Sequence, residues 1–162
     1  MSKLLKPGIA ILSALILQVT LLPAYIADPF KPNLLLIVVV WLGLRATPVR
    51  GALLAYLLGM VQDSCSGLYL GLNGFSFLVT FLVLQNIANR LYADNRYLMT
   101  LAVFVATIAC GLAHLVLLAL FSAAEGIYAS LLVSLIPQGA VNALVASVVF
   151  GFVDASQSEE VA

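Results

Sequence analysis

The chain consists of long apolar stretches separated by short polar segments. A first apolar run begins after Lys6 and continues to about residue 26, where aspartate, proline and lysine residues follow. A helix needs about 20 apolar residues to cross a bilayer, and this run is long enough. The whole pattern predicts about six helices, with approximate bounds 7–26, 33–45, 48–62, 73–89, 97–121 and 128–153. We therefore expect an all-α fold with the helices in one bundle.

Three of these predicted helices carry special features. The second and third are shorter than the usual spanning length, which local bilayer thinning or burial among neighbouring helices can accommodate. Thr47 is a candidate N-cap for the third helix, and Pro48 suits its first position. Pro137 interrupts the last apolar run, which predicts either a kinked helix or a short interfacial piece followed by a final span.

The composition favours a membrane environment. Of the 162 residues, 64% are hydrophobic and only 9% are charged, whereas soluble domains usually carry about 25% charged residues. A water-soluble fold could not cover its surface with so few polar groups. The run after Lys3 and Lys6 could mimic a signal peptide, but we interpret it as the first spanning helix. Residues 1–162 are expected to form a single multi-pass integral membrane domain.

The basic residues predict an orientation for this domain. If the N-terminus lies inside, six of the seven Lys and Arg residues fall on the cytoplasmic side and only Lys31 falls outside. Such a bias is typical of the cytoplasmic loops of membrane proteins. Both termini are then cytoplasmic, and Asp63 faces out. The formal net charge of +0 and the lack of a basic run leave nucleic-acid binding without an electrostatic basis.

Small residues recur at four-residue spacing in three predicted helices: Ala10 and Ala14; Gly51, Ala55 and Gly59; and Gly139, Ala143, Ser147 and Gly151. Small residues allow helix backbones to approach closely in a membrane, where lipid gives no hydrophobic drive to pack. Two interpretations follow. The ridges pack inside the bundle, or they form a docking surface for another membrane protein.

Polar residues also lie inside the apolar runs: Gln18, Asn73, Asn86, His114, Gln138 and Asn142. The simpler interpretation is hydrogen bonding between helices, and the sharper one is a ligand pocket or a proton path. A proton-coupled relay has little support because no Asp or Glu lies in the middle of a run. Asn33 lies in the polar hinge before the second helix.

Asp63 continues the ridge of Gly51, Ala55 and Gly59 at the end of the third helix. A carboxylate at a helix C-terminus opposes the macrodipole, so another group is expected to hold it. The backbone N–H groups of the glycine-rich turn that contains Gly71 are candidates. Asp63 is then a structural latch or a partner contact, or else an ordinary turn residue near water.

Catalytic constellations are not found. His114 is the single histidine, and neither a Ser/His/Asp arrangement, a Walker loop nor a metal-ligand spacing occurs. We expect no enzymatic activity, no cofactor and no metal. Cys65 and Cys110 fit no disulfide or metal framework and are expected to be unpaired.

Several short segments follow one another in a distinctive order: Gln18 to Pro23, Lys31 to Ile37, Gly51 through Gly59 to Gln62 and Asp63, then Gly67 and Gly71 to Asn73, and Pro137 before an apolar final helix. In this order they resemble MreD, a family of bacterial rod shape-determining membrane proteins. The specific part of the resemblance lies between about residues 18 and 73.

The resemblance implies a six-helix fold similar to the substrate-binding subunits of energy-coupling-factor vitamin transporters. It implies a scaffolding or regulatory role in cell elongation and lateral peptidoglycan synthesis at the bacterial cytoplasmic (inner) membrane, without chemistry. The implied partners are MreC, MreB filaments, the RodA glycosyltransferase and a class B penicillin-binding protein. The candidate residues for packing or partner contact are Ala10, Ala14, Gln18, Asn33, Gly51, Ala55, Gly59, Asp63, Gly71, Asn73, Gly139 and Ala143.

A second functional hypothesis is a substrate-binding membrane subunit of a vitamin-type transporter. Two features motivate it. Six helices are predicted, and Ala10 and Ala14 are spaced like the small-residue motif with which such subunits dock their partner. A pocket on the outer side would draw on Asp63, Tyr69, Asn73, Glu125 and Tyr128. Shape genes or transporter ATPase genes beside this one would discriminate the two hypotheses.

Overall fold

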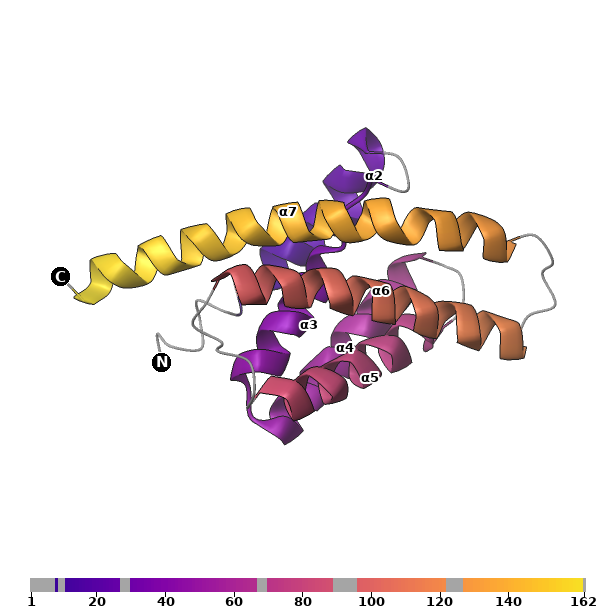
Figure 1. Ribbon diagram of the computed structural model, residues 1–162, viewed down its shortest axis with the longest axis horizontal. Coiled ribbons are helices and arrows are strands. Elements are labelled where there is room, and N and C mark those ends of the chain that lie inside the picture. Colours follow the sequence, from indigo (N-terminus) through magenta and orange to yellow (C-terminus); the bar gives the residue numbers. More distant parts are fainter. Residues whose placement is uncertain are drawn as a thin grey trace.

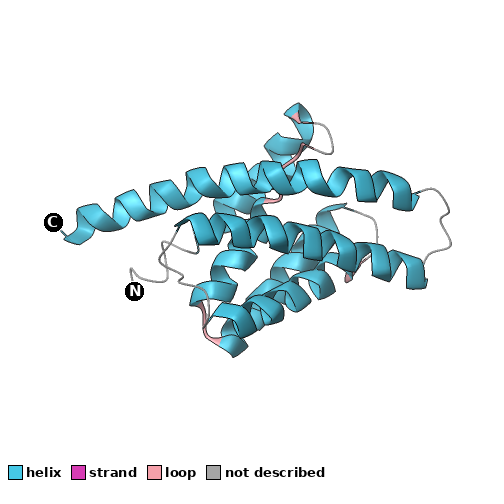
Figure 2. Ribbon diagram, viewed as in Figure 1, coloured by secondary structure: helices cyan, strands magenta, loops and turns pink. Residues whose placement is uncertain are grey.

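The computed structural model describes residues 8, 11–26, 30–66, 70–88, 96–121 and 127–161. Nearly all of these residues are helical, and no strand occurs among them (Figure 2). The prediction of an all-α fold is therefore confirmed.

The N-terminal helix has three parts. An α-helical part over residues 11–16 continues into a π-helical turn, η1 (Leu17–Leu21), and then into α2 (Leu22–Tyr25). No pattern in the sequence predicted the π-helical turn. The hydroxyl of Thr20 donates a hydrogen bond to the carbonyl of Ile16 within this region. A π-turn inserts an extra residue into a helix and is common at functional sites.

The remaining elements are α3 (Leu34–Arg45), α4 (Pro48–Ser66), α5 (Leu72–Ala88), α6 (Arg96–Phe121) and α7 (Ile127–Val161). Pro48 opens α4, and the N–H of Gly51 donates to the carbonyl of Thr47 at 2.9 Å. Two helices continue beyond the bounds expected from the sequence. α4 extends to Ser66, and α7 extends through the polar tail to Val161.

Pro137 lies inside α7, which is one helix and not two pieces. Proline removes one backbone hydrogen bond, but the turns on either side keep theirs. Of the two arrangements that the sequence left open, the split helix is therefore not the one observed.

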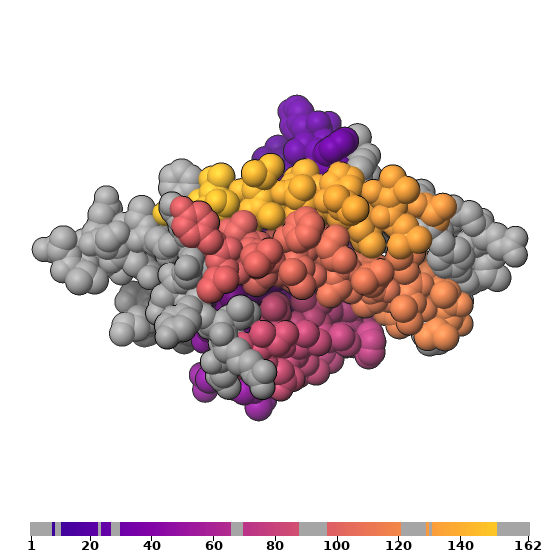
Figure 3. All heavy atoms as spheres, in the orientation of Figure 1, coloured from indigo at the N-terminus to yellow at the C-terminus, as the bar shows by residue number. Residues whose placement is uncertain are grey.

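Two helices are long and apolar enough to cross a bilayer, Tyr97–Leu120 in α6 and Leu131–Gly151 in α7. Only 28% and 22% of their apolar windows are buried. The core helix of a soluble protein would be mostly buried, whereas these two helices direct most of their apolar surface outward. They lie side by side along the length of the molecule (Figures 1 and 3).

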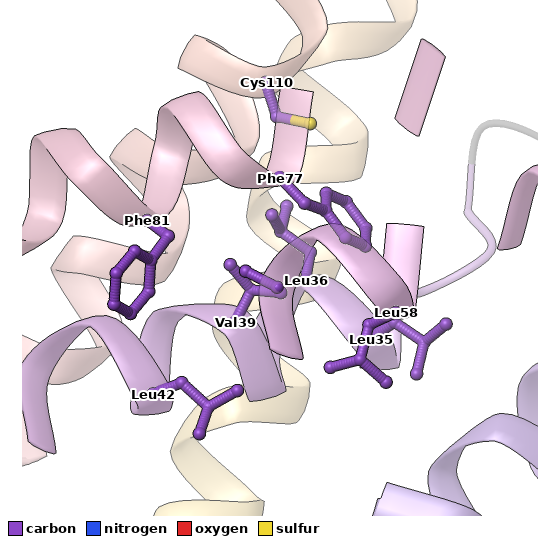
Figure 4. Close-up of a cluster of buried hydrophobic side chains, with 9 residues drawn as sticks. Leu35, Leu36, Val39, Leu42, Leu58, Phe77, Phe81 and Cys110 are labelled. Carbon is purple, nitrogen blue, oxygen red and sulfur yellow. The ribbon is translucent and has the colours of Figure 1, made fainter. Parts of the chain in front are cut away.

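α3 is the central helix of the bundle. Seven of its 12 residues are buried. One face packs against α4, α5 and α6 through a cluster that includes Leu35, Val39, Phe77 and Phe81 (Figure 4). This cluster supplies close packing, which drives helix association in apolar surroundings.

The opposite face of α3 packs against α5, α6 and α7. Ile37 and Val40 of α3 lie in a second buried cluster with Leu84, Val103 and Phe150. Neighbouring helices therefore cover both faces of α3, which is too short to span a membrane. Burial among neighbours is one of the ways in which a short helix is accommodated.

The N-terminal helix covers only a small part of this bundle. Ile11 and Leu15 pack against the first cluster, and Gln18 is buried. The α2 end projects beyond α7 (Figures 1 and 3), and Tyr25 at that end is 83% exposed.

Candidate functional site

The small-residue ridge of α4 lies against α5. Ala55 is fully buried, and a Cβ added at Gly51 would lie 2.4 Å from the ring of Phe81. A Cβ at Gly59 would lie 2.5 Å from the carbonyl oxygen of Asn73, which is backbone. Of the two interpretations of this ridge, internal packing is therefore the one that the contacts support.

Asp63 closes the ridge and holds the start of α5. Its Oδ2 accepts the backbone N–H groups of Gly71 at 2.9 Å and of Gly74 at 3.1 Å. Its Oδ1 accepts the backbone N–H of Asn73 at 3.0 Å and the Asn73 amide at 2.8 Å. The side chain is only 1% exposed. Backbone donors of the turn around Gly71 thus hold this carboxylate, as the sequence pattern suggested.

The arrangement removes the electrostatic conflict that Asp63 would otherwise create. A carboxylate near the end of α4 opposes the dipole of that helix, but the same carboxylate lies at the positive N-terminal end of α5. The first N–H groups of a helix have no intrahelical partner, and Asp63 satisfies three of them across the turn. Gly71 adopts a φ of +97°, which favours glycine in this turn.

A second buried polar network surrounds the N-terminus of α3. The N–H of Leu35 donates to Oε1 of Gln18 at 2.9 Å, and the Gln18 amide donates to Oδ1 of Asn33 at 3.1 Å. Asn33 is the N-cap of α3, and its Oδ1 also accepts the N–H of Leu36 at 3.1 Å. The π-helical turn of the N-terminal helix contains Gln18.

Asn142 of α7 extends this network to the far side of the bundle. Its Oδ1 accepts the N–H of Asn33 at 2.7 Å, and its amide donates to the Thr107 hydroxyl at 3.0 Å. Asn142 is fully buried and lies near the middle of the apolar window Leu131–Gly151. Side chains of the N-terminal helix, α6 and α7 are thus joined in one network at the start of α3. This network satisfies backbone N–H groups of α3 that water does not reach in an apolar interior.

Replacing Asn142 by leucine is expected to lower the free energy of unfolding by about 2 kcal/mol, because it leaves the buried N–H of Asn33 without its acceptor. Thermal unfolding in mild detergent, followed by the fluorescence of the single tryptophan, Trp41 of α3, measures the change. Asn86→Leu is the matched control because Asn86 is exposed and donates only to Leu82 of its own helix. Equal losses in both variants would contradict a special role for the network.

The other candidate residues lie in different places. Gly139 is buried, and a Cβ there would lie 3.1 Å from the ring of Phe104 on α6. Ala14 and Ala143 are half-buried, and Ala10 lies outside the described residues. A Cβ at Gly151 would meet nothing within 4 Å. The α7 ridge therefore packs at Gly139 and is open at Gly151.

Three buried hydroxyl residues were not among the candidates predicted from the sequence: Ser76, Thr80 and Thr107. A signal was present, because Ser76 and Thr80 follow Asn73 on one face of α5, and Thr107 precedes Cys110 and His114 on one face of α6. Helical spacing places such residues in one stripe. The polar stripes of α5 and α6 meet where Thr80 lies beside Cys110.

The chemistry of these networks is that of structural hydrogen bonding. Amide, hydroxyl and carboxylate groups bond to one another and to helix ends. Within the described residues, no group of three or more His, Cys, Asp or Glu side chains could hold a metal ion. Cys65 and Cys110 are free thiols, as predicted.

Comparison with known proteins gives the family. A family model described as rod shape-determining protein MreD matches residues 3–155. No curated protein and no solved structure gave a match. The matched range contains both buried networks and extends over nearly the whole chain, well beyond residues 18–73, which carried the specific part of the sequence resemblance. The chain therefore belongs to the MreD family of rod shape-determining membrane proteins.

Proposed function

We propose that this protein is a non-enzymatic, multi-pass scaffold of the bacterial inner membrane that supports cell elongation and lateral peptidoglycan synthesis. Membership of the rod shape-determining family supports this role. Its partners are an MreC-type protein, with MreB filaments, RodA and a class B penicillin-binding protein in the same machinery. The positive-inside bias of the sequence supports an orientation with both termini in the cytoplasm.

Contacts in this scaffold are made through helix faces within the membrane. The polar residues that could have formed an exposed recognition site are used internally: Gln18, Asn33, Asp63, Asn73 and Asn142 bond to one another or to helix ends. The ridge of Gly51, Ala55 and Gly59 is occupied by α5. A partner must therefore use a different face.

The N-terminal helix offers the face that we favour for the MreC-type partner. It packs on the bundle along one side and leaves Leu12 58% exposed and Ile16 51% exposed. Beyond Gln18 it leaves the bundle, so that Val19 and Leu21 are also exposed. A partner's transmembrane helix could lie along this side without displacing any internal contact. This exposure is the observation that carries the assignment of the face.

The transporter hypothesis has no support from these findings. Asp63 and Asn73, which would have lined an outer pocket, are buried and bonded to each other at 2.8 Å. Tyr69 and Glu125 lie outside the described residues. The family match points to shape determination.

The pair of changes Leu12→Trp and Ile16→Trp is expected to reduce co-purification with the MreC-type protein at least tenfold, because two indoles one turn apart block a close helix contact. The yield of partner on the tagged protein, extracted in mild detergent, is the measurement. Rod shape after depletion of the chromosomal copy is the second readout.

Leu101→Trp with Val105→Trp on α6 is the matched control. Both residues are 56% exposed and are also one turn apart. This pair should retain the partner and the rod shape. Equal retention by both pairs would exclude the N-terminal helix as the docking face. Failure of the unchanged protein to co-purify, together with normal rods after its depletion, would overturn the scaffold itself.

A further inference from the structure

Four buried side-chain atoms have no hydrogen-bond partner among the protein groups of the described chain: Gln62 Oε1, Ser76 Oγ, Gln85 Oε1 and His114 Nε2. Three of them belong to residues around Asp63. Buried polar atoms are rarely left without a partner, so a cluster of them indicates that something else satisfies them. Ser76 is the clearest case because its side chain is 0% exposed.

The helix geometry brings Ser76 and His114 to the same level. α5 and α6 are antiparallel neighbours, and the side chains of Thr80 on α5 and Cys110 on α6 lie beside each other. Ser76 lies one turn before Thr80, and His114 lies one turn after Cys110, so both are displaced by about 6 Å in the same direction.

Asp63 of α4 lies beside this pair. It bonds to Asn73 and Gly74 in the turn of α5 that precedes Ser76, and Ser76 shares its level with His114. Gln62 is adjacent to Asp63 on α4. Three of the four partnerless atoms therefore belong to residues of three different helices near Asp63, whereas Gln85 lies further along α5.

The chemistry of these atoms defines what can bind between them. The amide oxygen of Gln62 only accepts, the Ser76 hydroxyl both donates and accepts, and one imidazole nitrogen of a neutral histidine accepts. A metal ion fits poorly because Asp63 already accepts four N–H groups. A small molecule that both donates and accepts hydrogen bonds fits best. Water does so, and buried waters typically make about three such bonds.

We propose that α4, α5 and α6 enclose a water-binding site in which ordered water bridges Ser76 Oγ and His114 Nε2 beside Asp63. One helical turn from Ser76 and His114, the side chains of Thr80 and Cys110 bring α5 and α6 into direct contact. The water continues this connection toward Asp63 and links α6 to the α4–α5 pair. This site is independent of the face that docks a partner.

The single histidine makes the site directly observable. The full chain, labelled with ¹⁵N-histidine and reconstituted in phospholipid bilayers, is studied by solid-state NMR with magnetisation transfer from water protons. The unchanged protein should show a water contact at the imidazole of His114 although this nitrogen is buried. Ser76→Val removes the hydroxyl and fills its space, so the contact should fall at least fivefold.

Ser147→Val is the matched control because Ser147 is exposed on α7, and it should leave the His114 signal unchanged. Water transfer in the unchanged protein does not depend on whether the Ser76 variant folds. Its absence there would overturn the proposal, and so would a direct Ser76–His114 contact without water. An undiminished signal in folded Ser76→Val would remove Ser76 from the site and thereby contradict the bridge.

Discussion

Replacing Asp63 by alanine is expected to destabilise the protein by at least about 3 kcal/mol. The change removes the acceptor for three backbone N–H groups and for the Asn73 amide, all at a buried position. Each buried donor left without a partner costs about 1–3 kcal/mol, and bonds to a charged group lie at the upper end. The unfolding midpoint should fall by roughly 10 °C for a chain of this size.

Two further variants make this test specific. Asp63→Asn keeps one acceptor oxygen but turns an NH₂ group toward backbone donors, so an intermediate loss is expected. Ser64→Ala, one residue further along α4, should change the stability by less than about 0.5 kcal/mol, because Ser64 is exposed and its hydroxyl donates only to Met60 of its own helix. An Asp63→Ala protein that unfolds at the temperature of the unchanged protein would show that the carboxylate does not hold α5.

Gly59→Ala is expected to destabilise the protein by about 2 kcal/mol. Alanine in place of glycine would normally favour a helix by about 1 kcal/mol. Here the new Cβ would lie 2.5 Å from the Asn73 carbonyl oxygen and 2.5 Å from the Gly74 Cα. Both atoms are backbone and cannot rotate away, so α4 and α5 must separate. Overpacking of this kind costs about 1–3 kcal/mol beyond the gain in propensity.

Gly151→Ala is the matched control because a Cβ there meets nothing within 4 Å. It should leave stability unchanged or raise it slightly.

Gly59→Leu should disrupt the protein more than Leu58→Ala, even though Leu58 is a core residue at 7% exposure. A leucine at position 59 must displace backbone, whereas the alanine at 58 leaves a gap that neighbours can partly fill. Unfolding in detergent measures all four variants, and similar stability of Gly59→Ala and Gly151→Ala would refute the close contact.

Together these contacts make α4 and α5 a rigid pair. The glycine ridge brings the two backbones close, and Asp63 ties the end of one helix to the start of the other. Rigid elements are better suited than mobile ones to present a fixed surface to a partner. This rigidity would suit the scaffold role proposed above.

Much of the fold follows from local sequence signals. The apolar runs predicted the six helical stretches, Thr47 and Pro48 marked the start of the third helix, and the spacing of Gly51, Ala55 and Gly59 indicated a close helix contact. Asp63 could be assigned a backbone partner because a carboxylate at that end of a helix is unfavourable alone. Each of these features depends on residues that are near one another in the chain.

The tertiary structure decided which helices these residues join. Asn33 and Asn142 are 109 positions apart and meet at 2.7 Å, and no spacing in the sequence indicates such a contact. The same holds for Ser76 and His114, which share a level only because α5 and α6 are antiparallel. Small residues serve packing and docking equally well, so the sequence determined that helices would approach closely. Only the arrangement of all the helices determined that α5 occupies the α4 ridge and that the N-terminal helix keeps an open face.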